Sequence, residues 1–109
     1  MRQAEVYRSG ILAGTLTEEN QNSFIFRYDV NYFADQEKPA VSLTLPKTRQ
    51  EYHSTFLFPF FSNMLSEGAN RRIQSRMLQI DENDDFGILL ATAQYDTIGA
   101  VTVKPISTQ

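Results

Sequence analysis

The sequence contains no cysteine, no tryptophan and only one histidine among its 109 residues. Without cysteine the chain can form neither disulfides nor thiolate metal sites, which fits a reducing compartment. No apolar run approaches the roughly 18–20 residues of a membrane-spanning helix. The N-terminal residues 1–5 carry charges and lead into no hydrophobic stretch, unlike a signal peptide. The expected location is therefore the cytoplasm, without membrane attachment.

Positive charge is also in short supply. Ten basic side chains face 13 acidic ones, for a net charge of −3. Nucleic-acid binding without sequence preference needs a concentrated positive surface, so we expect no direct contact with nucleic acid. The five glycines are scattered and form no loop that could cradle a phosphate. The length suits one domain, residues 1–109, with a single core.

Strand patterns occupy the first part of the chain and its end. Residues 5–7 and 11–17 flank a turn that contains a glycine, and residues 24–28 place aromatic side chains at every second position. Residues 41–45 alternate in the same way and predict a further strand. Residues 98–103 predict a last strand that pairs near the N-terminal hairpin.

Helical patterns fill residues 54–93, after a charged stretch at 47–52 that predicts a loop. A first helix, capped by Ser54 or Thr55, is expected to end at Gly68. Strands, then helices, then one returning strand predict an α+β fold. We expect a twisted antiparallel sheet covered by two or three helices, with a sheet curled toward a small barrel as the alternative form.

Two further helices are expected in this region. One begins near Asn70 and places Ile73, Met77 and Ile80 on a single face, which predicts that this face packs on the core. Its arginines, Arg71, Arg72 and Arg76, would then form either a solvated face or a surface for an anion or a partner. The other helix begins at Asn83 or Asp84 and runs to about residue 93.

The acidic run at 81–85 allows a calcium interpretation, because Asp81, Asn83 and Asp85 have the first spacings of an EF-hand loop. The sixth position is Phe86 instead of glycine, and the twelfth is Thr92 instead of glutamate. A capped helix N-terminus, where carboxylates favour the positive end of the helix dipole, is the preferred interpretation.

His53, the one histidine, has no cysteine with which to build a zinc site. No G-x-S-x-G turn marks a nucleophile, so a solvated histidine in a polar loop is favoured over a catalytic one. We expect no catalytic, cofactor-binding or metal-binding residues in this chain.

Four phenylalanines gather within six residues, at positions 56, 58, 60 and 61. A helix turns by about 100° per residue, so these four side chains cannot share one narrow face. A helix packed on both sides and a partly exposed docking surface both account for the cluster, since exposed apolar patches usually mark interfaces. The two interpretations stay open.

Five short stretches occur in an order typical of one family. They are Gly14-Thr15-Leu16, Phe24-x-Phe26-x-Tyr28, Ser42-Leu43-Thr44-Leu45-Pro46, the run FFSNMLSEG from Phe60 to Gly68, and Asp96-Thr97-Ile98-Gly99-Ala100-Val101. Together they resemble the N-terminal domain of HipA, the kinase toxin of bacterial HipBA toxin–antitoxin systems. The resemblance covers essentially the whole chain.

This resemblance implies a protein-binding module without an active site. A HipA-like kinase needs a further body for its nucleotide and magnesium sites. In three-gene HipBST systems, the free-standing relative HipS binds the separate kinase HipT and acts as the antitoxin. The resemblance therefore implies a HipS-like subunit that restrains a HipA/HipT-like serine/threonine kinase. An alternative is an assembly or co-repressor subunit that joins a HipB-like helix-turn-helix protein on DNA.

The contact with the kinase is expected in the segment that follows the phenylalanine cluster. Its residues are Phe60, Phe61, Asn63, Ser66, Glu67, Gly68, Ala69, Asn70, Arg71 and Arg72. Three positions depart from the family pattern: Ser66 replaces a proline, Ala69 a frequent tryptophan, and Gln94 a glycine. The missing tryptophan implies a mode of inhibition different from that of relatives that carry it.

Overall fold

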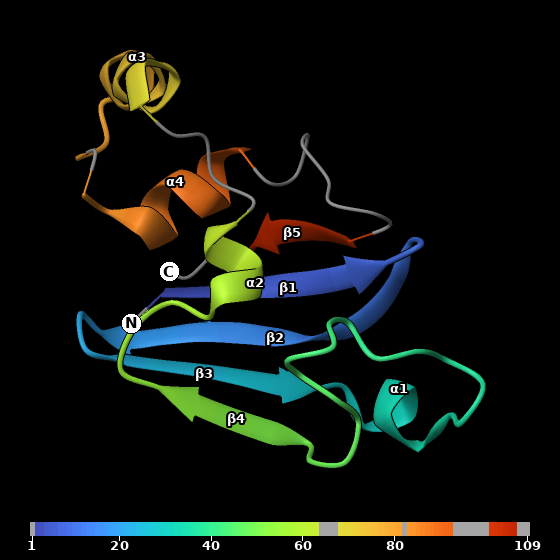
Figure 1. The fold of residues 1–109 in the computed structure, drawn as a ribbon. Coiled ribbons are helices and arrows are strands. Elements are labelled where there is room, and N and C mark those ends of the chain that lie inside the picture. The colour runs from blue at the N-terminus through green and yellow to red at the C-terminus, as the bar shows by residue number, and fades with distance from the viewer. Residues whose placement is uncertain (1, 64–67, 82, 93–100, 107–109) are drawn as a thin grey trace.

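The computed structural model describes residues 2–63, 68–81, 83–92 and 101–106. Its strands form one antiparallel sheet in the order β4-β3-β2-β1-β5 (Figure 1). The strands are β1 (Arg2–Arg8), β2 (Ile11–Asn20), β3 (Ser23–Tyr28), β4 (Glu51–Ser54) and β5 (Val101–Pro105). The helices are α1 (Val30–Ala34), α2 (Pro59–Ser62), α3 (Gly68–Leu78) and α4 (Asp85–Thr92). The predicted α+β class is confirmed.

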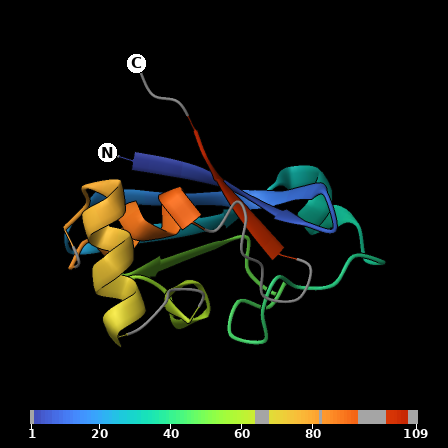
Figure 2. The same ribbon diagram turned by 90° about the horizontal axis from the view of Figure 1, so that it is seen from above.

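The sheet has two edges, β4 and β5, so its described strands stay open and do not close into the barrel considered above. Viewed from above, α2 and α3 lie on one side of the strands (Figure 2). No helix among the described residues is both long and apolar enough to cross a membrane.

The first three strands form the predicted meander. The two-residue turn between β1 and β2 consists of Ser9 and Gly10, whose φ angles of 53° and 79° are both positive, as a type I′ hairpin requires. In β3 the side chains of Phe24, Phe26 and Tyr28 are buried in alternation with more exposed neighbours. The period of two in the sequence therefore identified this strand and its core face correctly.

The last strand also lies where the sequence placed it. β5 pairs with β1 in antiparallel fashion, with Val103 opposite Val6 and Val101 opposite Arg8. Both valines of β5 are buried. The part of the predicted strand at 98–100, including Gly99, lies outside the described residues.

The predicted strand at 41–45 is wrong, and the edge strand β4 lies ten residues later. The Tyr28 hydroxyl accepts a hydrogen bond from the Val41 N–H at 3.0 Å and donates one to the Leu45 carbonyl. Val41 and Leu45 are thereby buried at the two ends of a turn. Leu43, at the tip of this turn, is 99% exposed. Alternation of apolar residues fits this turn as well as it fits a strand.

The edge strand β4 occupies the end of the predicted charged loop. It pairs with β3, so that Glu51 lies opposite Arg27 and His53 opposite Ile25. Its outward side chains Glu51 and His53 are exposed. Charged side chains are common on edge strands, because they discourage pairing with a further chain.

The first predicted helix is much shorter than expected. Only Pro59–Ser62 are helical, and Pro59 occupies the first turn, where its missing N–H costs nothing. Gly68, expected to end that helix, is instead the first residue of α3. α4 follows the prediction: Asp84 accepts a hydrogen bond from the Gly87 N–H at 3.1 Å and precedes Asp85, the first residue of the helix.

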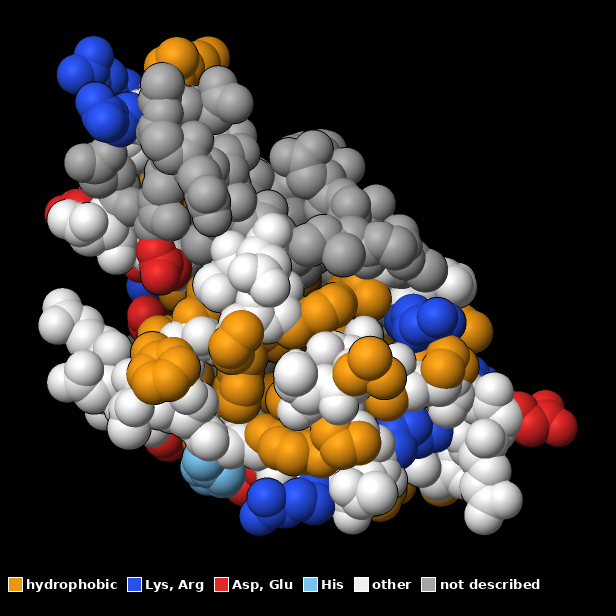
Figure 3. All heavy atoms as spheres, viewed as in Figure 1, with side chains coloured by type: hydrophobic (Ala, Val, Ile, Leu, Met, Phe, Trp, Pro, Cys, Tyr) orange, Lys and Arg blue, Asp and Glu red, His pale blue; other side chains and the backbone are white. Residues whose placement is uncertain are grey.

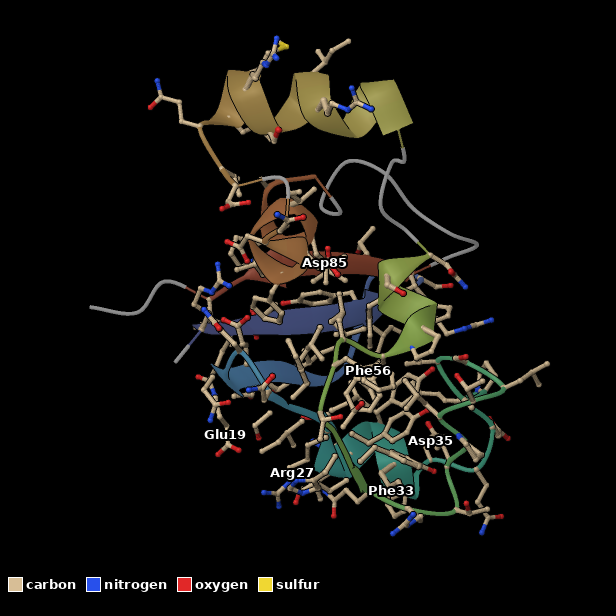
Figure 4. The ribbon with its side chains drawn as sticks, turned by 60° about the vertical axis from the view of Figure 1, so that its left-hand side comes forward. Glu19, Arg27, Phe33, Asp35, Phe56 and Asp85 are labelled. Atoms are coloured by element: carbon tan, nitrogen blue, oxygen red, sulfur yellow. The ribbon has the colours of Figure 1, made fainter. Side chains whose placement is uncertain are left out.

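The core lies between the sheet and the helices α1, α2 and α4. Their fully or nearly fully buried residues include Tyr32, Phe61, Phe86 and Leu89. α3 is different: it packs against α4 and is the outermost element in Figures 1 and 4. The prediction that Ile73 and Met77 face the core is wrong, since both are mostly exposed. Ile80, just after α3, does pack against the core.

Candidate partner-binding surface

The structure divides the segment predicted to contact a partner. Phe61 is completely buried and packs on Phe26, with 5.9 Å between their ring centroids. It is therefore a core residue, and the prediction that its side chain forms part of a contact surface is wrong. Phe60 is half-buried against the same core, while Asn63 is exposed.

The later part of the segment reaches α3. Ser66 and Glu67 lie outside the described residues. Gly68, Ala69, Asn70 and Arg71 form the first turn of α3, and Arg72 is the first residue of the helix whose side chain is described.

Exposed arginines mark the described part of α3. Arg72 and Arg76 stand one helical turn apart and are both exposed. Neither forms an ion pair with another described residue. Basic and hydrophobic side chains lie next to each other at the top of Figure 3, where α3 is located.

A second cluster of charges joins the start of the chain to α4. Arg2 donates two hydrogen bonds to the Asp84 carboxylate, at 3.0 and 2.8 Å, and a third to Glu18 at 2.7 Å. Its guanidinium also lies 5.3 Å from the centroid of the Phe86 ring. These contacts fasten α4 to the outer end of β1 and β2.

The pairing with Arg2 predicts a pH dependence of stability. Hydrogen bonds from Arg2 hold the pKa of Asp84 below its ordinary value of 3.8. A lowered folded-state pKa stabilises the protein above the ordinary pKa, and this contribution is lost as the pH falls through the folded value. We therefore expect Asp84→Asn, which can still cap α4, to flatten the decline of Tm below about pH 5.

Thermal unfolding followed by circular dichroism at a series of acidic pH values measures this effect. Glu37→Gln, at an exposed position without an ion pair to a described residue, is the matched control and should keep the wild-type profile. Superimposable profiles of Asp84→Asn and the wild type would contradict the prediction.

Next to this cluster lies a groove of about 830 Å³. Apart from Arg2, three parts of the chain line it: the end of β2 with the start of β3, the connection from β4 to α2, and the stretch that leads from α3 into the start of α4. Glu19, Phe56 and Asp85 represent these three parts in Figure 4. The buried rings of Phe24 and Phe86 belong to the lining, and Phe56 adds a ring that is 65% exposed.

The charge of this groove is unbalanced. Five carboxylates and one guanidinium line it, which gives it −4, whereas the whole chain carries −3. The acidic excess of the protein is thus concentrated here, and the remaining surface carries about one net positive charge. Such a groove repels phosphate groups and attracts basic side chains.

The residues considered for catalysis and metal binding have other roles. His53 Nε2 lies 2.6 Å from a carboxylate oxygen of Glu51, on the exposed side of β4. Asp81 accepts a hydrogen bond from the Asn83 N–H, and Asp84 caps α4, which confirms the capping interpretation. Within the described ranges, no three acidic or histidine side chains gather as metal ligands would.

Sequence reasoning missed two parts of these surfaces. The contact between Arg2 and Asp84 joins residues 82 positions apart, and nothing in the local pattern connects them. Glu18 and Glu19, at the end of β2, line the groove, although no local pattern connects them with residues 81–85. The concentration of carboxylates at 18–19 and 81–85 was the one available indication.

Comparison with known proteins gives a consistent result. A family model described as "HipA N-terminal domain" matches residues 4–104. An uncharacterized protein of Haemophilus influenzae is 32% identical over 104 residues, which cover 95% of this chain and 92% of that protein. A solved structure described as the N-terminal domain of HipA toxin superimposes with a TM-score of 0.74 and 27% identity, over 100% of this chain and 96% of that one.

Two longer relatives come from Sinorhizobium fredii. The putative kinases Y4dM and Y4mE are 32% and 26% identical to 84% and 96% of this chain. The aligned regions make up 24% and 25% of their lengths, so the chain corresponds to about a quarter of each.

Proposed function

The chain belongs to the HipA N-terminal domain family, a non-catalytic domain, and on this premise we propose that it is a subunit that binds and restrains a separate HipA-like serine/threonine kinase of a toxin–antitoxin system. The observation that carries this proposal is the distribution of the domain among its relatives. It makes up about a quarter of two putative kinases, whereas the Haemophilus protein is covered over 92% of its length. A domain found in both arrangements is suited to act on a kinase body in trans.

The surface supports this proposal. Large apolar side chains gather in solvent on this side of the molecule: Phe56, Ile73 and Met77 each expose more than half of their surface. Exposed apolar groups that adjoin charged ones are typical of protein interfaces. The concentration of negative charge in the groove also favours a protein partner over direct contact with DNA.

Co-expression with a HipA-like kinase from the same organism tests the proposal. We expect rescue of growth and co-purification of the two proteins. The variant Arg72→Glu, at an exposed position of α3, should weaken the complex and leave the melting temperature unchanged. Glu67→Lys, in the predicted contact segment, should also weaken the complex. A stable complex without rescue would favour an assembly or co-repressor subunit of a helix-turn-helix complex. If the kinase is neither bound nor restrained, so that growth is not rescued, both functions are refuted.

A further inference from the structure

The helix α3 buries the polar Ser75 against the protein and presents the apolar Ile73 and Met77 to solvent. Its one residue that is described as buried is Ser75, whose hydroxyl donates to the Arg72 carbonyl at 2.9 Å. Ile73 is 54% exposed and Met77 is 78% exposed. In an ordinary surface helix this arrangement is reversed, with the apolar stripe toward the core.

Helix geometry explains how these residues are distributed. Residues two positions apart differ by about 200° around the axis, so Ile73 and Met77 both lie about 160° from Ser75. They are one turn apart and form a single stripe on the side of α3 opposite α4. Leu78, 43% exposed, lies about 60° from Ser75, on the side of the helix away from the arginines.

The other flank is basic. Arg72 and Arg76 lie about 60° and 100° from Ser75, between the buried side and the outward stripe. Both arginines are exposed and form no ion pair with a described residue. The outward face of α3 therefore combines an apolar centre with two guanidinium groups along one border, a pattern typical of helices that dock into a groove.

We propose that this outward face of α3, defined as Ile73 and Met77 with Arg72 and Arg76 beside them, docks into an apolar groove bordered by carboxylates on the kinase body. The inference rests on the proposed function and names its contact residues. In the related putative kinases about three quarters of the chain lies outside the matched domain, so there is a body against which such a face can be buried. The basic border determines the charge expected of that body.

Substitutions in the stripe test the inference in the full chain. Burial of one such side chain is worth enough binding energy that Met77→Glu should weaken binding to the purified kinase by about 10- to 100-fold. Ile73→Glu should have a similar effect. Since both side chains are mostly exposed in the free protein, their variants should melt at the wild-type temperature.

Matched controls separate the stripe from general effects of charge. Val30→Glu also replaces an exposed apolar residue with glutamate, and Val30 is 64% exposed. It belongs to α1, which lies far from α3 in Figure 1, so this variant should bind like the wild type. Arg76→Glu should weaken binding, and the loss should shrink at high salt because exposed charges are screened. Arg27→Glu, an exposed arginine of β3, is its charge-matched control.

Isothermal titration calorimetry, with size-exclusion chromatography of the free chain, separates the outcomes. Loss of binding in the stripe variants and in Arg76→Glu, with wild-type binding by Val30→Glu and Arg27→Glu, supports the inference. Equal binding by all variants overturns it and leaves the proposed function intact, whereas no binding by the wild type overturns the proposed function itself. A wild-type dimer that Met77→Glu converts into a monomer also overturns the inference, because a second copy would then cover α3.

Discussion

Phe61→Ala is expected to lower the free energy of unfolding by about 3–5 kcal/mol, among the largest effects of any single substitution in this chain. The side chain is completely buried and lies within 7 Å, between ring centroids, of Phe26, Phe58 and Phe60. Its removal takes apolar surface out of the core and leaves a cavity that neighbouring rings cannot fill without moving. The free energy of unfolding of a small domain is about 5–15 kcal/mol, so this loss would be a large fraction of the stability.

Chemical denaturation with urea measures this loss as a shift of the midpoint at constant slope. Phe56→Ala is the matched control: the same substitution at a ring that is 65% exposed should change stability by no more than about 0.5 kcal/mol. Comparable losses in the two variants would contradict the placement of Phe61 in the core.

This prediction also governs how binding experiments are interpreted. Phe61 belongs to the family pattern and to the segment expected to contact the kinase. A Phe61→Ala protein that fails to bind the kinase would be explained by loss of the fold. Substitutions at exposed residues such as Met77 are therefore the informative ones.

Gly14→Ala is expected to cost about 3 kcal/mol, the upper part of the usual range for overpacking. A Cβ at this position would lie 2.4 Å from the Arg27 carbonyl oxygen and 3.0 Å from the Phe26 ring. The Arg27 carbonyl belongs to β3, which pairs with β2 on one side and β4 on the other, so it cannot move away without disturbing two ladders. The glycine is required here by the close approach of a neighbouring strand.

Gly10→Ala is the control for this prediction, because it isolates the backbone effect. Gly10 has a φ of 79° but no atom within 4 Å of its would-be Cβ. Its substitution should cost only about 1–2 kcal/mol, the strain of a left-handed backbone. Urea midpoints of the two variants give the comparison, and a Gly14→Ala protein as stable as Gly10→Ala would refute the steric explanation.

Local patterns identified several elements correctly, for reasons that are visible in the structure. The alternation at Phe24, Phe26 and Tyr28 marks a strand with one buried face, and the carboxylate of Asp84 caps α4. The motif Gly14-Thr15-Leu16 was recognised as part of a family pattern, and the contact distances now explain its glycine.

Other predictions failed where two structures satisfy the same local pattern. Residues 41–45 alternate like a strand, but hydrogen bonds with the Tyr28 hydroxyl hold them in a turn, and β3 pairs instead with Glu51–Ser54. The period of Ile73 and Met77 correctly indicated an apolar helix face. It could not show what that face packs against, because periodicity is a property of the helix alone.

The sequence by itself determined the α+β class, the N-terminal meander, the pairing of the last strand beside it, and the family. The class and the meander follow from short-range alternation, turn residues and capping, which depend on neighbours in the chain, and the family follows from the five motifs that resemble it. Only the tertiary structure decided that Phe61 is core, that Arg2 joins Asp84 across the molecule, and that α3 turns its apolar face outward. These features depend on which distant surfaces meet, and that is settled when the whole chain packs.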